Sequence, residues 1–212
     1  MRIFNPDNGI FRYTEKLADL IILSVFWLVC SLPLVTVGPA TAALYHTVVH
    51  CIRGNGRNSW GMFFTTFKSN FKVGTLTSLV VVPLFGVLLI LHELLYQAAL
   101  VDSTGYVLYF AYRVFLLLPV GAVCYVFPVL SRFTFQVNGL LMTSAKLAIA
   151  HLPTTVLMAL ILFAALVVCS NILVFLFVMP TVVAWMHSYL LERIFKPYVD
   201  AQRPPQEEET EV

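Results

Sequence analysis

Long apolar stretches dominate the chain, and polar positions are confined to the short segments between them. A helix needs about 20 mostly apolar residues to cross a bilayer core about 30 Å thick. Five stretches approach or exceed that length: Leu17–Val37, Val73–Leu95, Tyr106–Leu130, Leu152–Cys169 and Ile172–Leu191. They are continuous and do not alternate with polar residues, which favours helices over a membrane barrel. The pattern predicts an all-α, polytopic transmembrane helical bundle of about five spans over residues 1–200.

Proline and glycine interrupt the first stretch. Pro33 is followed by the Gly38-Pro39 pair, and because proline removes a backbone donor it ends or bends a helix. We therefore expect the first helix to break within or near the bilayer. Broken helices line cavities in transporters, but kinked helices are also common as plain architecture. The candidates for a helix break or a path lining are Pro33, Thr36, Gly38, Pro39, Tyr45 and His46.

Three shorter helices are expected at the membrane interface, over residues 40–52, 59–72 and 133–150. The second is the most amphipathic, with Trp60 and several phenylalanines near one face and lysines towards the other. Aromatic residues at helical spacing beside lysines suit an interfacial helix. A helical extension of the second span, packed on its neighbours, is equally compatible. The Pro- and Glu-rich tail, residues 201–212, is expected to be disordered.

Composition supports the membrane interpretation. The 212 residues are 59% hydrophobic and only 11% charged, whereas soluble domains carry about 25% charged residues. The formal net charge of +2 gives no basis for a nucleic-acid partner. The four cysteines lie far apart and form no CxxC pair, so neither a disulfide framework nor a metal knuckle is expected.

Basic residues cluster in alternate loops, which indicates the orientation in the membrane. Short loops rich in Lys and Arg stay in the cytoplasm, and five spans then place the C-terminus inside and the N-terminus outside the cell membrane. Alternatively, residues 17–52 form a hairpin that turns at Pro33–Pro39, and the N-terminus is cytoplasmic too. That alternative suits the charge rule better, but its second limb is short for a full crossing. The candidate residues for cytoplasmic docking are Arg53, Arg57, Lys68, Lys72 and Arg132.

A search for reactive groups finds no enzyme motif. His92-Glu93 begins like the HExxH zinc motif, but Tyr96 replaces the second histidine, and one histidine cannot hold a catalytic zinc ion. We instead expect Glu93 to pair with Arg113 across a short loop, or both to extend to the interface. His46 and His50 have a ligand spacing on one helix face, without a third ligand nearby. We expect no catalytic residue, no cofactor and no metal.

Three motifs carry a resemblance to a known family. WLVCSLPLVTVGPATAALY at residues 27–45, FFTTFKSNFK at 63–72 and YVFPVLSRF at 125–133 resemble the YesL-like family of bacterial integral membrane proteins. The resemblance covers nearly the whole chain except the acidic tail. It implies a domain of unknown function from Gram-positive bacteria, often encoded beside carbohydrate ABC importers. The family has no established catalytic residues, so none is carried over.

Two functional hypotheses remain. The first is an accessory or scaffold component that works with the permease and ATPase subunits of a carbohydrate ABC importer. The second is an independent small solute transporter or channel that acts as a homo-oligomer. The scarcity of charge within the expected spans disfavours the second, because ion-coupled carriers usually place acids or histidines along their path.

Overall fold

Helices account for all regular structure in the part of the chain that the computed structural model describes, residues 9–54, 56 and 58–202. The α-helices are α1 (Gly9–Ser31), α2 (Val37–Thr47), α3 (Ser59–Ser69), α4 (Phe71–Ala99), α5 (Ser103–Arg132), α6 (Val137–Ala150), α7 (Leu152–Asn171) and α8 (Met179–Gln202). Shorter segments are the 3-10 helices Leu34–Thr36 and Leu173–Phe177 and the π-helical turn Val48–Arg53. The predicted all-α class is confirmed for these residues.

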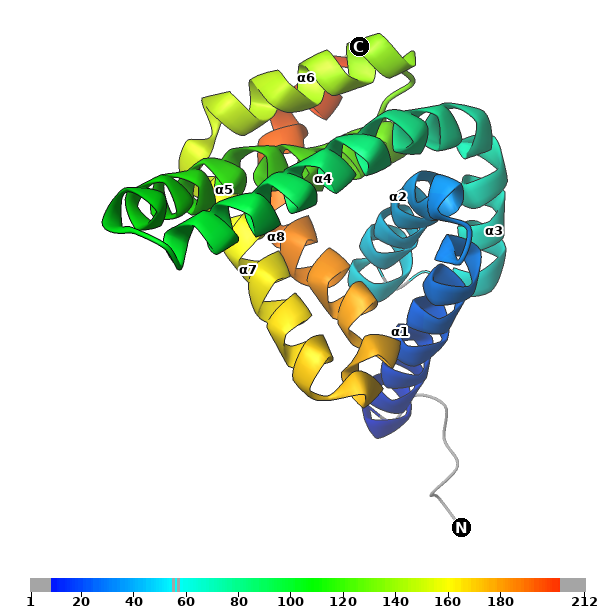
Figure 1. The fold of residues 1–212 in the computed structure, drawn as a ribbon. Coiled ribbons are helices and arrows are strands. Elements are labelled where there is room, and N and C mark those ends of the chain that lie inside the picture. Colours follow the sequence, from blue (N-terminus) through cyan, green and yellow to red (C-terminus); the bar gives the residue numbers. More distant parts are fainter. Residues whose placement is uncertain (1–8, 55, 57, 203–212) are drawn as a thin grey trace, which may run out of the picture.

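Two long hairpins lie beside a group formed by α1, α2 and α3 (Figure 1). One hairpin is α4 with α5 and the other is α7 with α8, while α6 packs against α4, α5 and α7. Asp102 begins α5, because its carboxylate accepts the Gly105 N–H at 2.6 Å and so satisfies a free donor of the first turn. The tips of the two hairpins point in different directions (Figure 1).

Among the described helices, α4, α5 and α7 are long and apolar enough to cross a membrane. Their outward faces carry large exposed apolar side chains, such as Leu89, Ile90 and Phe163. Soluble proteins rarely expose apolar patches of this extent. A lipid bilayer is therefore the environment that accounts for these faces, and the chain is a membrane protein.

Helix α2 lies at the centre of the fold and packs against α1, α3, α4, α5 and α8. Most of its side chains are buried, including Ala40, Ala42 and Ala43. Residues 40–52 are therefore mostly buried inside the group of helices, and their expected position at the membrane interface stays a prediction. The reason for the burial is the run of small side chains, which lets neighbouring helices approach α2 from several directions.

Glycines make the contact between α2 and α4. A Cβ on Gly74 would lie 2.8 Å from the Pro39 nitrogen, and one on Gly38 would collide with the Gly74 carbonyl oxygen. The Gly38 N–H also donates to Ser78 Oγ at 2.8 Å. Small residues thus bring the two backbones together, as is common where helices pack in membranes.

Helices α1 and α2 run antiparallel. Trp27 Nε1 donates to Thr41 Oγ1 at 3.0 Å, and towards the start of α1 the Asp19 carboxylate accepts from Ser59 Oγ at 2.8 Å. The chain leaves α1 at Ser31 and passes through the 3-10 segment before α2 begins. Residues 19 and 59 therefore lie at the same end of this pair.

Helix α3 packs its aromatic side chains on α1. The Phe26 ring lies 5.7 Å from Trp60, 5.9 Å from Phe63 and 5.2 Å from Phe64, measured between ring centroids. Phe63 is fully buried, whereas Trp60 and Phe64 are exposed. The segment thus combines a packed face with an exposed aromatic face.

The last hairpin differs from the prediction. We expected a tight turn at Ser170-Asn171 followed directly by a span over residues 172–191. Instead, Leu173–Phe177 forms an exposed 3-10 segment, and α8 begins at Met179. Its apolar composition resembles that of a helix, so hydrophobicity alone does not locate this turn. Residues 203–212, most of the expected tail, lie outside the described residues.

Candidate functional site: a polar network beside a basic pocket

The end of α5, the middle of α8 and the C-terminal half of α2 meet at a charged group of side chains. Arg132 binds Glu192 through both carboxylate oxygens, with Nε at 3.0 Å from Oε1. The same Oε1 accepts the Tyr45 hydroxyl at 3.0 Å. Arg132 and Glu192 form an ion pair, and their side chains are 18% and 23% exposed. Both charges are therefore balanced in a largely buried position.

Two histidines extend this group along α2 and the π-helical turn. The His46 and His50 rings lie 4.3 Å apart. His46 Nδ1 is 3.3 Å from the Ser131 carbonyl oxygen, and His50 Nε2 is 3.3 Å from an Arg132 nitrogen. His50 therefore accepts from Arg132 as a neutral imidazole.

Arg53 joins from the end of the π-helical turn. Its Nη1 donates to the Ser188 carbonyl oxygen at 2.7 Å, and its guanidinium carbon lies 4.3 Å from the centre of the Tyr189 ring. Both partners are neutral, so they fix the orientation of Arg53 without cancelling its charge. We call Tyr45, His46, His50, Arg53, Arg132 and Glu192 the polar network.

A cavity of about 520 Å³ lies beside the polar network. We call it the basic pocket, because four cations and two carboxylates line it: Arg53, Arg132, Arg193, Lys196, Glu192 and Asp200. Tyr189 and Val199 complete its wall. The balance of charge is positive, so the pocket favours anions.

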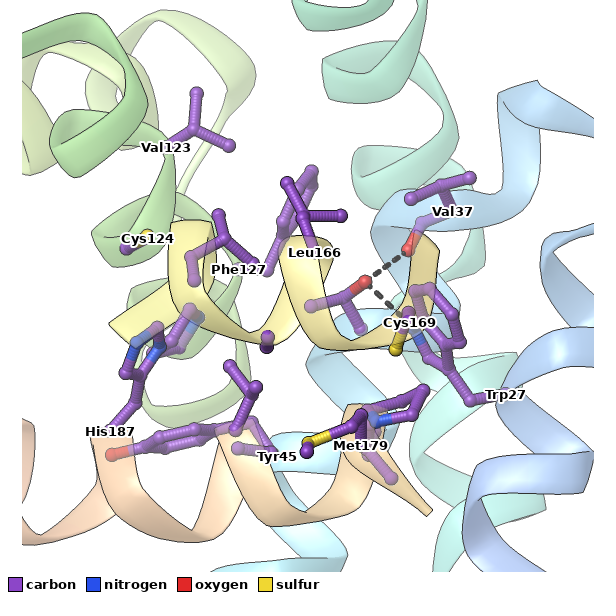
Figure 2. A pocket seen from close by; sticks show the side chains of 18 of the residues that line it. Trp27, Val37, Tyr45, Val123, Cys124, Phe127, Leu166, Cys169, Met179 and His187 are labelled. Carbon is purple, nitrogen blue, oxygen red and sulfur yellow. Dashed lines mark hydrogen bonds between the residues drawn. The ribbon is translucent and has the colours of Figure 1, made fainter. Parts of the chain in front are cut away.

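A second cavity, of about 290 Å³, lies between α1, α2, α5, α7 and α8 (Figure 2). Almost all of its lining is apolar, with Leu166, Phe127 and Met179 among the residues shown. We call it the apolar cavity. Tyr45 belongs to both sites, since its ring lines the apolar cavity and its hydroxyl binds Glu192.

Polar side chains in the wall of the apolar cavity already have partners. Trp27 donates to Thr41, whose hydroxyl donates to the Val37 carbonyl oxygen at 2.7 Å (Figure 2). His187 Nε2 lies 3.1 Å from the Met158 carbonyl oxygen. Because these hydrogen bonds are made within the protein, few donors and acceptors remain for a polar solute in this cavity.

The residues proposed for the helix break are divided between different roles. Pro33 is exposed and extended at the start of the 3-10 segment, and the Thr36 hydroxyl donates to the Cys30 and Pro33 carbonyl oxygens. Gly38 and Pro39 pack on α4. Tyr45 and His46 belong to the polar network. Among the six candidates, all of them described residues, Tyr45 alone also lines the apolar cavity.

The expected Glu93–Arg113 pair does not form. Glu93 accepts instead from Gln97 one helical turn away at 2.7 Å, and the Arg113 guanidinium carbon lies 5.6 Å from the Tyr109 ring centre. Both side chains are exposed on the α4–α5 hairpin. A neighbour on the same helix is available to each group, so a pair across the loop is not required.

The candidate docking residues fall into two groups. Lys68 and Lys72 are exposed at the junction of α3 and α4, whereas Arg53 and Arg132 bind partners within the protein. Arg57 lies outside the described residues. Within those described, no group of three His, Cys, Asp or Glu side chains could hold a metal ion.

Glu192 is the central residue that the sequence interpretation missed. It lies directly after the expected last span, where a charge is unremarkable. The available signal was the acid beside Arg193 at the end of an apolar stretch. Its partners Tyr45 and Arg132 are 147 and 60 residues away, and no local pattern indicates them.

Comparisons with known proteins identify relatives of this chain. Residues 20–91 match the family described as "Protein of unknown function, DUF624". The chain is 31% identical over 163 residues to "Uncharacterized protein YesL" of Bacillus subtilis (strain 168), which covers 75% of this chain and 76% of that protein. No solved structure matches the chain.

Proposed function

This chain belongs to the DUF624 family of proteins of unknown function, and from that premise we propose that it is a non-enzymatic accessory or scaffold component associated with carbohydrate ABC import. The association with carbohydrate import is what the resemblance to the YesL-like family implies. We place the protein in the cytoplasmic membrane of a Gram-positive bacterium, with a cytoplasmic C-terminus. Its partners are the bilayer and the permease and ATPase subunits of the importer.

The observation that carries this proposal is the character of the apolar cavity. Sugars carry many hydroxyl groups, and a site for them needs donors and acceptors aimed into it. In this cavity Trp27, Thr41, Tyr45 and His187 use their polar atoms within the protein. The interior therefore suits helix packing better than passage of a polar solute, which supports a scaffold over an independent transporter.

Exposed lysines supply a surface for a partner. Lys68 and Lys72 lie at the junction of α3 and α4, near the exposed ring of Phe64 and that of Phe71. Basic and aromatic side chains together are typical of surfaces that bind at the membrane interface. We infer that this junction docks on the partner subunits.

The arrangement of α1 and α2 bears on the topology. If α1 and α8 each cross the membrane once, together with α4, α5 and α7, the chain has the five spans expected. The antiparallel pairing of α1 with α2 instead supports the hairpin alternative, because Asp19 and Ser59 lie at the same end. We infer that the N-terminus and the basic segment around Arg53 face the cytoplasm, as the charge rule prefers.

Epitope tags test this topology. A tag at each terminus is probed with protease in right-side-out and inside-out vesicles, and we expect both tags to be cleaved only in inside-out vesicles. Cleavage of the two tags from opposite sides would refute the hairpin arrangement.

Co-purification tests the function. The tagged chain is extracted gently from its native membrane, and its partners are quantified by mass spectrometry. We expect permease and ATPase subunits in stoichiometric amounts, and recovery of this chain alone would overturn the proposal. A Lys68→Glu/Lys72→Glu variant should lose these partners, whereas Lys146→Glu, an exposed charge reversal on α6, should retain them.

A further inference from the structure

We propose that the basic pocket binds a phosphate group. The pocket is separate from the exposed lysines assigned to partner docking. It is formed where the π-helical turn, the end of α5 and the C-terminal half of α8 meet. Its volume of about 520 Å³ leaves room for a phosphate group and water.

One helical face supplies much of the pocket. Tyr189, Arg193, Lys196 and Asp200 follow one another along α8 at spacings of four, three and four residues. Residues at these spacings share one side of a helix. The side chains of α8 thus project towards Arg53 and Arg132 across the same cavity.

The charges in this pocket are not all balanced. Glu192 is bound on both oxygens by Arg132 and also accepts from Tyr45, so its charge is matched within the polar network. Arg53 is held by a neutral carbonyl and a neutral ring. The side chains of Arg193 and Lys196 are exposed on α8 and line the pocket. Guanidinium and ammonium donors around one cavity are the groups that bind phosphate oxygens.

Arg53 is oriented before a ligand arrives. Its bond to Ser188 uses one nitrogen, and the Tyr189 ring supports the flat face of the guanidinium. A guanidinium carries five N–H donors, so others remain for a phosphate. Fixing the side chain in advance reduces the entropy lost on binding.

Aromatic side chains place this pocket near the lipid headgroups. Trp185 and Tyr189 are both exposed on α8, with their ring centroids 5.6 Å apart. Exposed Trp and Tyr residues are enriched at the membrane–water interface. A phosphate at this level is carried either by an anionic phospholipid or by a small soluble anion.

Two measurements distinguish these sources, using the full chain in phosphatidylcholine nanodiscs. In the first, phosphatidylglycerol is added to the nanodiscs and the lipids retained by the protein are counted by native mass spectrometry. In the second, radiolabelled inorganic phosphate is followed by equilibrium dialysis. Selective retention of phosphatidylglycerol indicates a lipid headgroup, and saturable uptake of phosphate indicates a soluble ligand. Either result supports the proposal. If the protein retains no phosphatidylglycerol selectively and also takes up no phosphate, the proposal is overturned.

Paired substitutions locate the binding. Arg193→Gln/Lys196→Gln should weaken it about ten- to thirtyfold, since each basic side chain near the membrane surface contributes about 1 kcal/mol. Arg113→Gln/Lys146→Gln removes the same charge from exposed positions outside the pocket and should leave binding unchanged. An equal loss in both variants would show attraction by general surface charge and refute the site. Arg193→Lys/Lys196→Arg keeps the charge and should bind, which separates loss of the site from loss of the fold.

Discussion

The close contact between α2 and α4 leads to a quantitative prediction about Gly74. Replacing it with alanine would place a Cβ 2.8 Å from the nitrogen, 2.9 Å from Cδ and 3.0 Å from Cα of Pro39. These atoms belong to a backbone and a rigid ring, so they cannot rotate away. Either the helices separate or the contact is strained, and overpacking of this kind typically costs about 1–3 kcal/mol.

Gly86 provides the matched control. It lies in the same helix, α4, and a Cβ there would meet nothing within 4 Å. Alanine favours a helix over glycine by about 1 kcal/mol at either position, so this effect cancels when the two variants are compared. Gly74→Ala should therefore be about 1–3 kcal/mol less stable than Gly86→Ala.

Thermal unfolding in nanodiscs measures this difference. The reaction of the buried Cys124 thiol with a label reports the fraction unfolded at each temperature. For a chain of this size 1 kcal/mol corresponds to about 2–4 °C, so the midpoints should differ by about 2–12 °C. Equal midpoints would refute the argument, because they would show that α2 and α4 do not rely on close backbone contact.

Other predictions concern the polar network and the apolar cavity. Glu192→Gln should lower the free energy of unfolding by about 1–3 kcal/mol, because it leaves the largely buried Arg132 without its counter-charge, whereas the exposed Glu93→Gln should have little effect on the unfolding midpoint. In a cysteine-free background, Thr41→Cys in the apolar cavity should resist a polar thiol reagent while Asn58→Cys in the exposed loop reacts; rapid labelling of both would indicate a water-filled path.

Hydrophobic patterning alone located the three membrane-capable helices. The expected stretches at residues 73–95, 106–130 and 152–169 correspond to α4, α5 and α7 within a few residues. Length and apolar content determine such helices, because the backbone must satisfy its own hydrogen bonds in lipid. The same reasoning placed residues 172–178 in a membrane-spanning helix, where the chain instead forms an exposed 3-10 segment between α7 and α8. Apolar composition is common to both outcomes, so the position of the turn depends on how α8 packs.

The central position of α2 and the polar network could not be predicted in this way. Residues 40–52 have the length and composition of a peripheral helix, and only their neighbours make them central. Glu192 gains its role from Tyr45 and Arg132, both distant in the chain. Pairwise contacts of this kind are set by the tertiary fold, and one sequence contains no local signal for them.

Lipid is as apolar as a leucine side chain, so the hydrophobic effect does not select which helices of a membrane protein pair. In this chain, close contacts and buried hydrogen bonds make that selection. Ser24 and Thr181 bring α1 to α8 with hydroxyl oxygens 2.6 Å apart, and a Cβ on Gly121 would lie 3.0 Å from the Thr155 carbonyl oxygen where α5 meets α7. Each of these positions joins two particular helices, so we expect a bulky substitution there to weaken that contact while the helices themselves still form. The apolar stretches therefore determine that helices form, and a few small and polar residues within them determine which helices lie together.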